Sequence, residues 1–237
     1  MMFDLAGYGP QILDGTVTTI ELSVLSLIVS AALGLIGASA KLSKNRVAVA
    51  IATVYTTIIR GVPDLVLMLL IFYSLQIWLN DATDYLNNIQ NSIDFEISLD
   101  PFISGVITLG FIYGAYFTET FRGAFMSVPR GQLEAARAFG MQPFLIFRRI
   151  LFPQMMRFAL PGLANNWQVI LKATALVSLI GLADVVKAAE NAGNGTFRTF
   201  YFMCIAGLVY LVLTILSNFA LTLLERKYAV GVRKAVL

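Results

Sequence analysis

Residues 199–224 read TFYFMCIAGLVYLVLTILSNFALTLL and contain no charged side chain. A helix rises about 1.5 Å per residue, so this run is long enough to cross about 30 Å of hydrocarbon. Residues 22–40, LSVLSLIVSAALGLIGASA, are also uncharged and of spanning length. Of the 237 residues in the chain, 58% are hydrophobic and 13% are charged, whereas soluble domains are about a quarter charged. The sequence therefore predicts an all-α integral membrane protein.

Three further membrane spans are expected between these two runs. Residues 47–80 and 157–183 are each largely apolar but contain ionisable side chains. We expect each stretch to form one helix that carries those side chains inside the bilayer. Together with an apolar stretch near residue 110, this predicts five transmembrane helices in a single domain that covers residues 1–237. Their expected bounds are about 15–40, 47–80, 101–122, 157–183 and 199–224.

The charges of the loops predict how the spans are oriented. Basic residues gather in loops 41–46 and 122–157 and in the C-terminal tail, whereas loop 81–100 carries acidic residues only. Cytoplasmic loops of multispanning proteins carry an excess of Lys and Arg. The C-terminus is therefore expected in the cytoplasm and, with five spans, the N-terminus outside. Residues 1–20 contain no Lys or Arg and lack the basic region of a cleavable signal peptide, so we expect the first helix to be retained.

The composition argues against several classes of chemistry. The chain has no histidine, and its one cysteine, Cys204, lies within an apolar run. Few groups are therefore left for metal binding or for catalysis by a membrane enzyme. No G-x-x-x-x-G-K-[ST] pattern is present, so any ATP must be hydrolysed by a partner. The net charge of +3 is small and does not indicate nucleic acid. We expect the chain itself to have no catalytic residue and to bind no metal or cofactor.

The long basic loop contains the pattern of a short helix. Residues 127–153 read SVPRGQLEAARAFGMQPFLIFRRILFP. Pro129 suits the first turn of a helix, and Gly140 suits its end because glycine accepts a left-handed backbone. The sequence predicts a helix near 131–140 whose small alanines and flanking apolar residues suit a groove on another protein. An amphipathic helix on the membrane surface has the same spacing, so the residues alone leave both interpretations open.

This loop resembles the EAA loop of bacterial ABC-importer permeases. The residues shared with that pattern are Glu134, Ala135, Ala136, Gly140, Ile150 and Pro153. One position departs from it, because Phe152 stands where leucine is usual. Three flanking stretches are similar to the Q-type permeases of polar amino acid uptake systems, in particular those for histidine, lysine, arginine and ornithine. They are RGVPDLVLMLLIFYSLQI (60–77), ITLGFIYGAYFTETFRGAFMSVP (107–129) and ALPGLANNWQVILKATALVSLIGLADVVKA (159–188).

The resemblance implies a permease subunit of an ATP-driven importer for basic amino acids in the bacterial cytoplasmic (inner) membrane. The expected partners are a second, similar permease subunit in a hetero- or homodimer, two cytoplasmic ATPase subunits that hold ATP and Mg, and an extracytoplasmic substrate-binding protein. Closure of the ATPases is expected to drive alternating access through the 127–153 loop. The residues expected to couple the chain to the ATPase are Glu134, Ala135, Ala136, Arg137 and Gly140.

Ionisable side chains within the second predicted span are candidates for the substrate pathway. A charge inside a bilayer is costly and usually faces a cavity or a partner. Arg60 and Asp64 lie four residues apart on one helical face, on either side of Pro63. One interpretation is a self-contained ion pair that stabilises a proline kink. The other is that the pair opens when substrate arrives, so that Asp64 recognises a cationic amino acid.

Polar residues in two other spans allow similar alternatives. Asn165, Gln168 and Lys172 share a face of the fourth predicted span and offer one cation and two amides to an amino acid. Amides also serve helix packing in membranes. We expect Glu119 near the inner end of the third span, paired with Arg122, and regard it and Pro63 as structural or gate residues.

Another function class shares some of these features. A stand-alone, gradient-driven amino acid carrier also needs intramembrane charges and broken helices. The family resemblance and the 127–153 loop favour the ATP-driven importer, because a carrier acting alone has no ATPase to contact.

Overall fold

The computed structural model describes residues 5–90 and 100–228, and the regular elements in those ranges are all helical. The α-helices, in chain order, are α1 (Gly9–Leu42), α2 (Arg46–Gly61), α3 (Asp64–Gln90), α4 (Pro101–Met126), α5 (Arg130–Ala138), α6 (Pro143–Ile146), α7 (Phe152–Ala173), α8 (Val185–Thr196) and α9 (Thr199–Tyr228). A π-helical turn, Phe147–Leu151, joins α6 to α7, and a 3₁₀ turn, Thr174–Ile180, follows α7. The predicted all-α class is confirmed.

The lengths and apolar content of these helices agree with the predicted number of spans. Within the described residues, α1, the part of α3 over Asp64–Tyr85, α4 and α9 are each long and apolar enough to cross a membrane. A fifth crossing is formed if Pro143–Ile180 and α8, which meet at a bend of 52°, are counted together. Residues 184–198, which lie between the fourth and fifth predicted spans, are mostly helical. Asp184 caps α8 by accepting a hydrogen bond from the backbone nitrogen of Lys187 at 2.9 Å.

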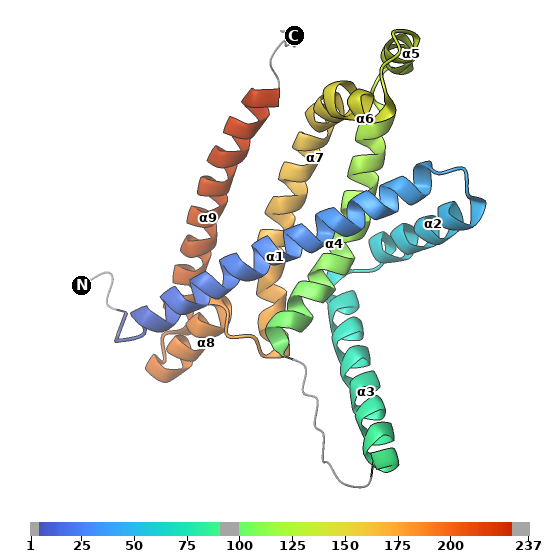
Figure 1. The fold of residues 1–237 in the computed structure, drawn as a ribbon. Coiled ribbons are helices and arrows are strands. Elements are labelled where there is room, and N and C mark those ends of the chain that lie inside the picture. The colour runs from blue at the N-terminus through green and yellow to red at the C-terminus, as the bar shows by residue number, and fades with distance from the viewer. Residues whose placement is uncertain (1–4, 91–99, 229–237) are drawn as a thin grey trace.

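The prediction of one helix over 47–80 is wrong. The helix ends at Gly61, Val62 is extended (φ −112°, ψ 141°), and a new helix begins at Asp64. Pro63 explains the break, because proline has no N–H to donate and disfavours helical backbone at the residue before it. The two helices run in different directions, and α3 extends away from the rest of the bundle (Figure 1). The predicted second span therefore corresponds to two helices, of which α3 alone has spanning length and composition.

The centre of the bundle is the crossing of α1 and α4, where glycines allow the two backbones to come close. A Cβ atom at Gly34 would lie 2.4 Å from the Cβ of Phe117, and one at Gly110 would lie 2.4 Å from Cγ1 of Val29. Successive contacts advance in the same direction along both helices, so α1 and α4 run parallel. Gly114 is packed in the same way against Leu33, and such small residues let membrane helices approach closely.

Different helices lie at the two ends of the bundle. The coupling candidate α5 and the last turns of α9 lie at one end, whereas α8 lies near the start of α1 at the other end (Figure 1). At the first end, Nε of Arg157 donates to the carbonyl of Tyr228 at 3.2 Å. At the other end, the rings of Tyr8 and Phe202 meet edge to face at 6.0 Å. The basic loop and the C-terminal end of α9 therefore share one side of the bundle.

Candidate functional site

The predicted coupling helix is present as α5 and ends as the sequence indicates. The backbone nitrogen of Gly140 donates to the carbonyl of Arg137 at 2.9 Å, and that of Met141 donates to Ala136 at 3.1 Å. This pair of bonds is the Schellman motif, which requires a left-handed residue at the position of Gly140. Gly140 has φ +74°. The glycine therefore sets where α5 stops and how the chain turns into α6.

One side of α5 packs on the bundle and the other side is open. Ala136 is buried at 4% exposure, and the amide of Gln154 on α7 donates to the side-chain oxygen of Gln132. Phe139 just beyond the helix is 88% exposed, although a large apolar side chain is costly to leave in water. Glu134, Ala135 and Arg137 are exposed as well. The helix thus packs on α6 and the π-helical turn and has one hydrogen bond to α7, while it presents an apolar and charged surface outward.

Arg60 and Asp64 are close in the chain but do not form an ion pair in the described part of it. The Arg60 guanidinium lies over the ring of Tyr116, 5.5 Å from its centroid, which is a cation–π arrangement. Asp64 accepts a hydrogen bond from the hydroxyl of Tyr113 at 2.8 Å. Both tyrosines belong to α4. On either side of Pro63, Arg60 thus lies on the Tyr116 ring and Asp64 is bound by Tyr113. The self-contained Arg60–Asp64 pair is not observed in the described residues.

Some polar residues of α7 form hydrogen bonds to other helices, and others are exposed. Gln168 donates to Asn218 of α9 at 3.0 Å, and Asn166 donates to Thr120 of α4 at 3.1 Å. Asn165 and Lys172 are exposed and lie seven residues apart, two turns along one face of the helix. The structure therefore places the Gln168 amide in the α7–α9 contact. Asn165 and Lys172 form a separate open polar face.

Glu119 forms ion pairs with Lys41 and Arg122, and Lys41 in turn contacts a third helix. Its two carboxylate oxygens accept from Lys41 of α1 and from Arg122 one turn further along α4, the latter at 2.8 Å. Lys41 also donates to the hydroxyl of Thr56 on α2 at 2.6 Å. The predicted pairing of Glu119 with Arg122 is confirmed. No local pattern indicates that Lys41 pairs with Glu119, because this contact depends on how α1 packs on α4.

Comparison with known proteins gives consistent relatives over the full length. Residues 30–230 match the family described as binding-protein-dependent transport system inner membrane component. The chain is 61% identical to the histidine/lysine/arginine/ornithine transport system permease protein HisQ of Salmonella typhimurium strain LT2, over 98% of this chain and 100% of that protein. It is 58% identical to HisQ of Escherichia coli strain K12, with the same coverage of both chains.

Solved structures give the same fold. A crystal structure of an amino acid ABC transporter with histidines is similar at a TM-score of 0.77 and 31% identity, covering 96% of this chain and 100% of that chain. An inward-facing MetNI methionine ABC transporter is similar at a TM-score of 0.69 and 15% identity, covering 93% of this chain and 97% of that one. At that identity the second likeness shows the fold alone.

Proposed function

The chain belongs to the family of binding-protein-dependent transport system inner membrane components, and we propose that it is the permease subunit of an ATP-driven importer for basic amino acids. Its relatives at 58% and 61% identity are named for the transport of histidine, lysine, arginine and ornithine. Its membrane is the bacterial inner membrane. We place the N-terminus outside and the C-terminus in the cytoplasm, following the basic residues of the 122–157 loop and of the C-terminal tail.

The observation that carries this proposal is the shape of α5. The helix is anchored on α7 through Gln132 and Gln154, ends at a glycine with φ +74°, and exposes Phe139 to 88%. A short rigid helix with an open apolar and charged face suits a groove on a partner protein. We assign that partner as a cytoplasmic ATPase, which would hold ATP and Mg itself. A second similar permease and an extracytoplasmic binding protein complete the proposed complex.

The polar cluster beside the Pro63 break is the proposed place for substrate recognition. Tyr113 holds one carboxylate oxygen of Asp64 at 2.8 Å, and the Tyr116 ring holds Arg60. A carboxylate has about four lone-pair sites, so Asp64 retains acceptor capacity for an ammonium or guanidinium group. The face formed by Asn165 and Lys172 on α7 is a second candidate, because a cation suits the substrate carboxylate.

ATP-dependent uptake is the experiment that tests the function. We expect proteoliposomes that contain this permease with its second permease, ATPase and binding protein to accumulate labelled arginine or histidine only when ATP is supplied to the ATPase side. Liposomes with the permease subunits alone serve as the control and are expected to remain empty. Uptake driven by a proton or sodium gradient in that control would contradict the proposal and identify a stand-alone carrier.

Replacing Asp64 with asparagine is expected to weaken recognition of cationic substrates. Asparagine keeps an oxygen for the Tyr113 hydroxyl but removes the charge, and a hydrogen bond to a charged group contributes about 1.5–3 kcal/mol. The KM for arginine or lysine should rise about tenfold or more, since 1.4 kcal/mol is a factor of ten. The KM for citrulline, a neutral analogue of arginine, should change little.

Asp84→Asn is the matched control for this change, because Asp84 is an exposed carboxylate near the far end of the same helix. The measurement is made with and without the binding protein, which also selects substrate. An equal loss for arginine and citrulline in Asp64→Asn would remove Asp64 from recognition and leave it a structural role.

A further inference from the structure

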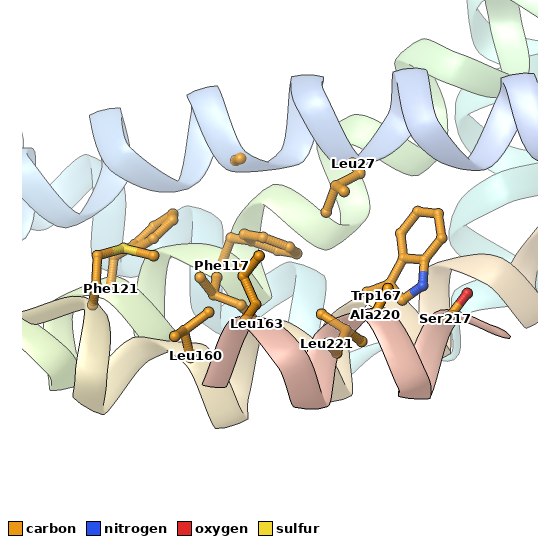
Figure 2. Close-up of a pocket in the computed structure, with 12 residues that line it drawn as sticks. Leu27, Phe117, Phe121, Leu160, Leu163, Trp167, Ser217, Ala220 and Leu221 are labelled. Atoms are coloured by element: carbon orange, nitrogen blue, oxygen red, sulfur yellow. The ribbon is translucent and has the colours of Figure 1, made fainter. Parts of the chain in front are cut away.

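An apolar groove runs along the bundle between α1, α4, α7 and α9. It encloses about 420 Å³ and is lined by side chains of all four helices, including Leu27, Phe117, Phe121, Leu163, Trp167 and Leu221. Figure 2 shows these side chains directed into the space between the helices, with Phe121 at one end and Trp167 at the other. The lining is almost entirely apolar, so the groove suits a hydrocarbon occupant.

The position and length of the groove match one leaflet of the bilayer. On α7 its lining extends from Met156 to Trp167, which is about 16 Å by helical rise. That length is roughly half of the 30 Å hydrocarbon thickness. Met156 precedes Arg157, which lies at the end of the bundle that carries α5. With the orientation proposed above, the groove belongs to the inner leaflet.

The side of α9 next to the groove has the properties of a lipid-facing surface. Leu216 and Phe219 are 61% and 67% exposed and flank the lining residues Ser217 and Ala220 in the chain. Large apolar side chains exposed in this way are stable in hydrocarbon but costly in water. An acyl chain can therefore enter the groove from the surrounding lipid without crossing a polar barrier.

The inner end of the groove meets a small polar pocket. This pocket encloses about 130 Å³, shares Leu160 with the groove, and is lined by Arg157, Pro161, Glu225 and Tyr228. The Arg157 guanidinium is a permanent cation that binds phosphate well, and Glu225 is an acid on the opposing helix α9. One cation and one acid side by side complement a headgroup that carries a phosphate and an ammonium.

We propose that the groove and the polar pocket together bind one inner-leaflet phospholipid with an amine headgroup, phosphatidylethanolamine. One acyl chain fills the groove, the phosphate contacts Arg157 and the ammonium contacts Glu225. The lipid then packs between α1 and α9, where the protein itself leaves space. A purely anionic headgroup fits less well, because its charge is repelled by Glu225.

Lipid binding to the purified complex tests this site without any transport measurement. The complex is incubated with deuterated phosphatidylethanolamine or phosphatidylglycerol, and bound lipid is counted by native mass spectrometry. Ala220→Trp fills the groove and is expected to reduce bound phosphatidylethanolamine at least tenfold. Phe219→Trp is the control, because it adds bulk at an exposed neighbouring position and should leave binding unchanged.

Glu225→Gln provides a second, milder test of the headgroup. It should reduce the preference for phosphatidylethanolamine over phosphatidylglycerol about tenfold, while total lipid bound stays the same. Equal lipid binding in Ala220→Trp and Phe219→Trp would contradict the proposal that the groove binds a lipid. A disulfide cross-link between Ala220→Cys, made in a Cys204→Ser background, and a cysteine in the second permease would also contradict the proposal. The groove would then be an interface between the two permease subunits.

Discussion

Replacing Ala136 with aspartate is expected to abolish ATP-driven uptake while the chain still inserts into the membrane. Ala136 is 4% exposed on the side of α5 that packs on the bundle, and burying an unpaired carboxylate costs several kcal/mol. The helix should leave its position on α6 and α7, so that movement of the ATPase no longer reaches the membrane helices. Uptake should fall at least a hundredfold, measured in proteoliposomes of the assembled complex.

The controls separate coupling from folding. Ala136→Ser is small and neutral and should retain uptake. Gly140→Asp should also abolish transport, because it adds a negative charge at the C-terminal end of α5, where the helix dipole is negative. Gly140→Asn has no charge and tolerates the left-handed backbone at φ +74°, so it should keep much of the activity. Normal transport in purified complexes with Ala136→Asp or Gly140→Asp would show that α5 does not couple the permease to the ATPase.

Removal of the Glu119 charge is expected to give the largest loss of stability. Glu119 accepts from Lys41, whose side chain is only 10% exposed, and from Arg122. In Glu119→Gln the part-buried Lys41 ammonium loses its counter-charge. Breaking a fully buried ion pair from one side costs about 3–5 kcal/mol, and we expect the lower end of that range, about 3 kcal/mol, for this pair. For a chain of this size each kcal/mol corresponds to roughly 2–4 °C. The melting temperature of the purified complex should fall by about 6 °C or more.

A double variant tests the cause of that loss. Lys41→Gln with Glu119→Gln removes both charges but keeps polar side chains that can contact Thr56. Its melting temperature should lie closer to that of the natural chain than that of Glu119→Gln does, since replacing both members of a buried pair costs less than removing one. If the double variant is as unstable as the sum of the two single variants, Lys41 and Glu119 are not energetically coupled.

The features that the sequence predicts well are those set by local residues. Uncharged runs predict α1 and α9, and Gly140, which follows the short helix pattern, predicts that α5 ends just before it. The proline at Pro63 was expected to kink one helix, whereas it separates α2 from α3, because Val62 adopts an extended backbone. Proline excludes helix locally, but the angle between the two pieces is decided by what they pack against.

The features that the sequence does not predict depend on packing between distant segments. Tyr113 and Tyr116 reach Asp64 and Arg60 only because α4 lies beside the break between α2 and α3. Lys41 was assigned to a loop, but α1 continues to Leu42 and carries it to Glu119. These partners lie far apart in the chain. The pattern of apolar residues within each helix does not indicate how α1, α3 and α4 are aligned with one another.

Helix α4 runs without a break between the proposed substrate site and the proposed ATPase contact. The same helix carries Glu119 and Tyr113, whose hydroxyl donates to Asp64. It ends at Met126, and the three residues 127–129 form the turn that leads to Arg130 at the start of α5. Tyr113 and Met126 are about 20 Å apart by helical rise, and close packing on α1 limits bending between them. A movement of α5 that is passed on to α4 would then alter the surroundings of Asp64. If substrate binds at Asp64 and α5 contacts an ATPase, as proposed, thermodynamic reciprocity requires that substrate change the ATP affinity of that partner by the same factor by which ATP changes the affinity for substrate.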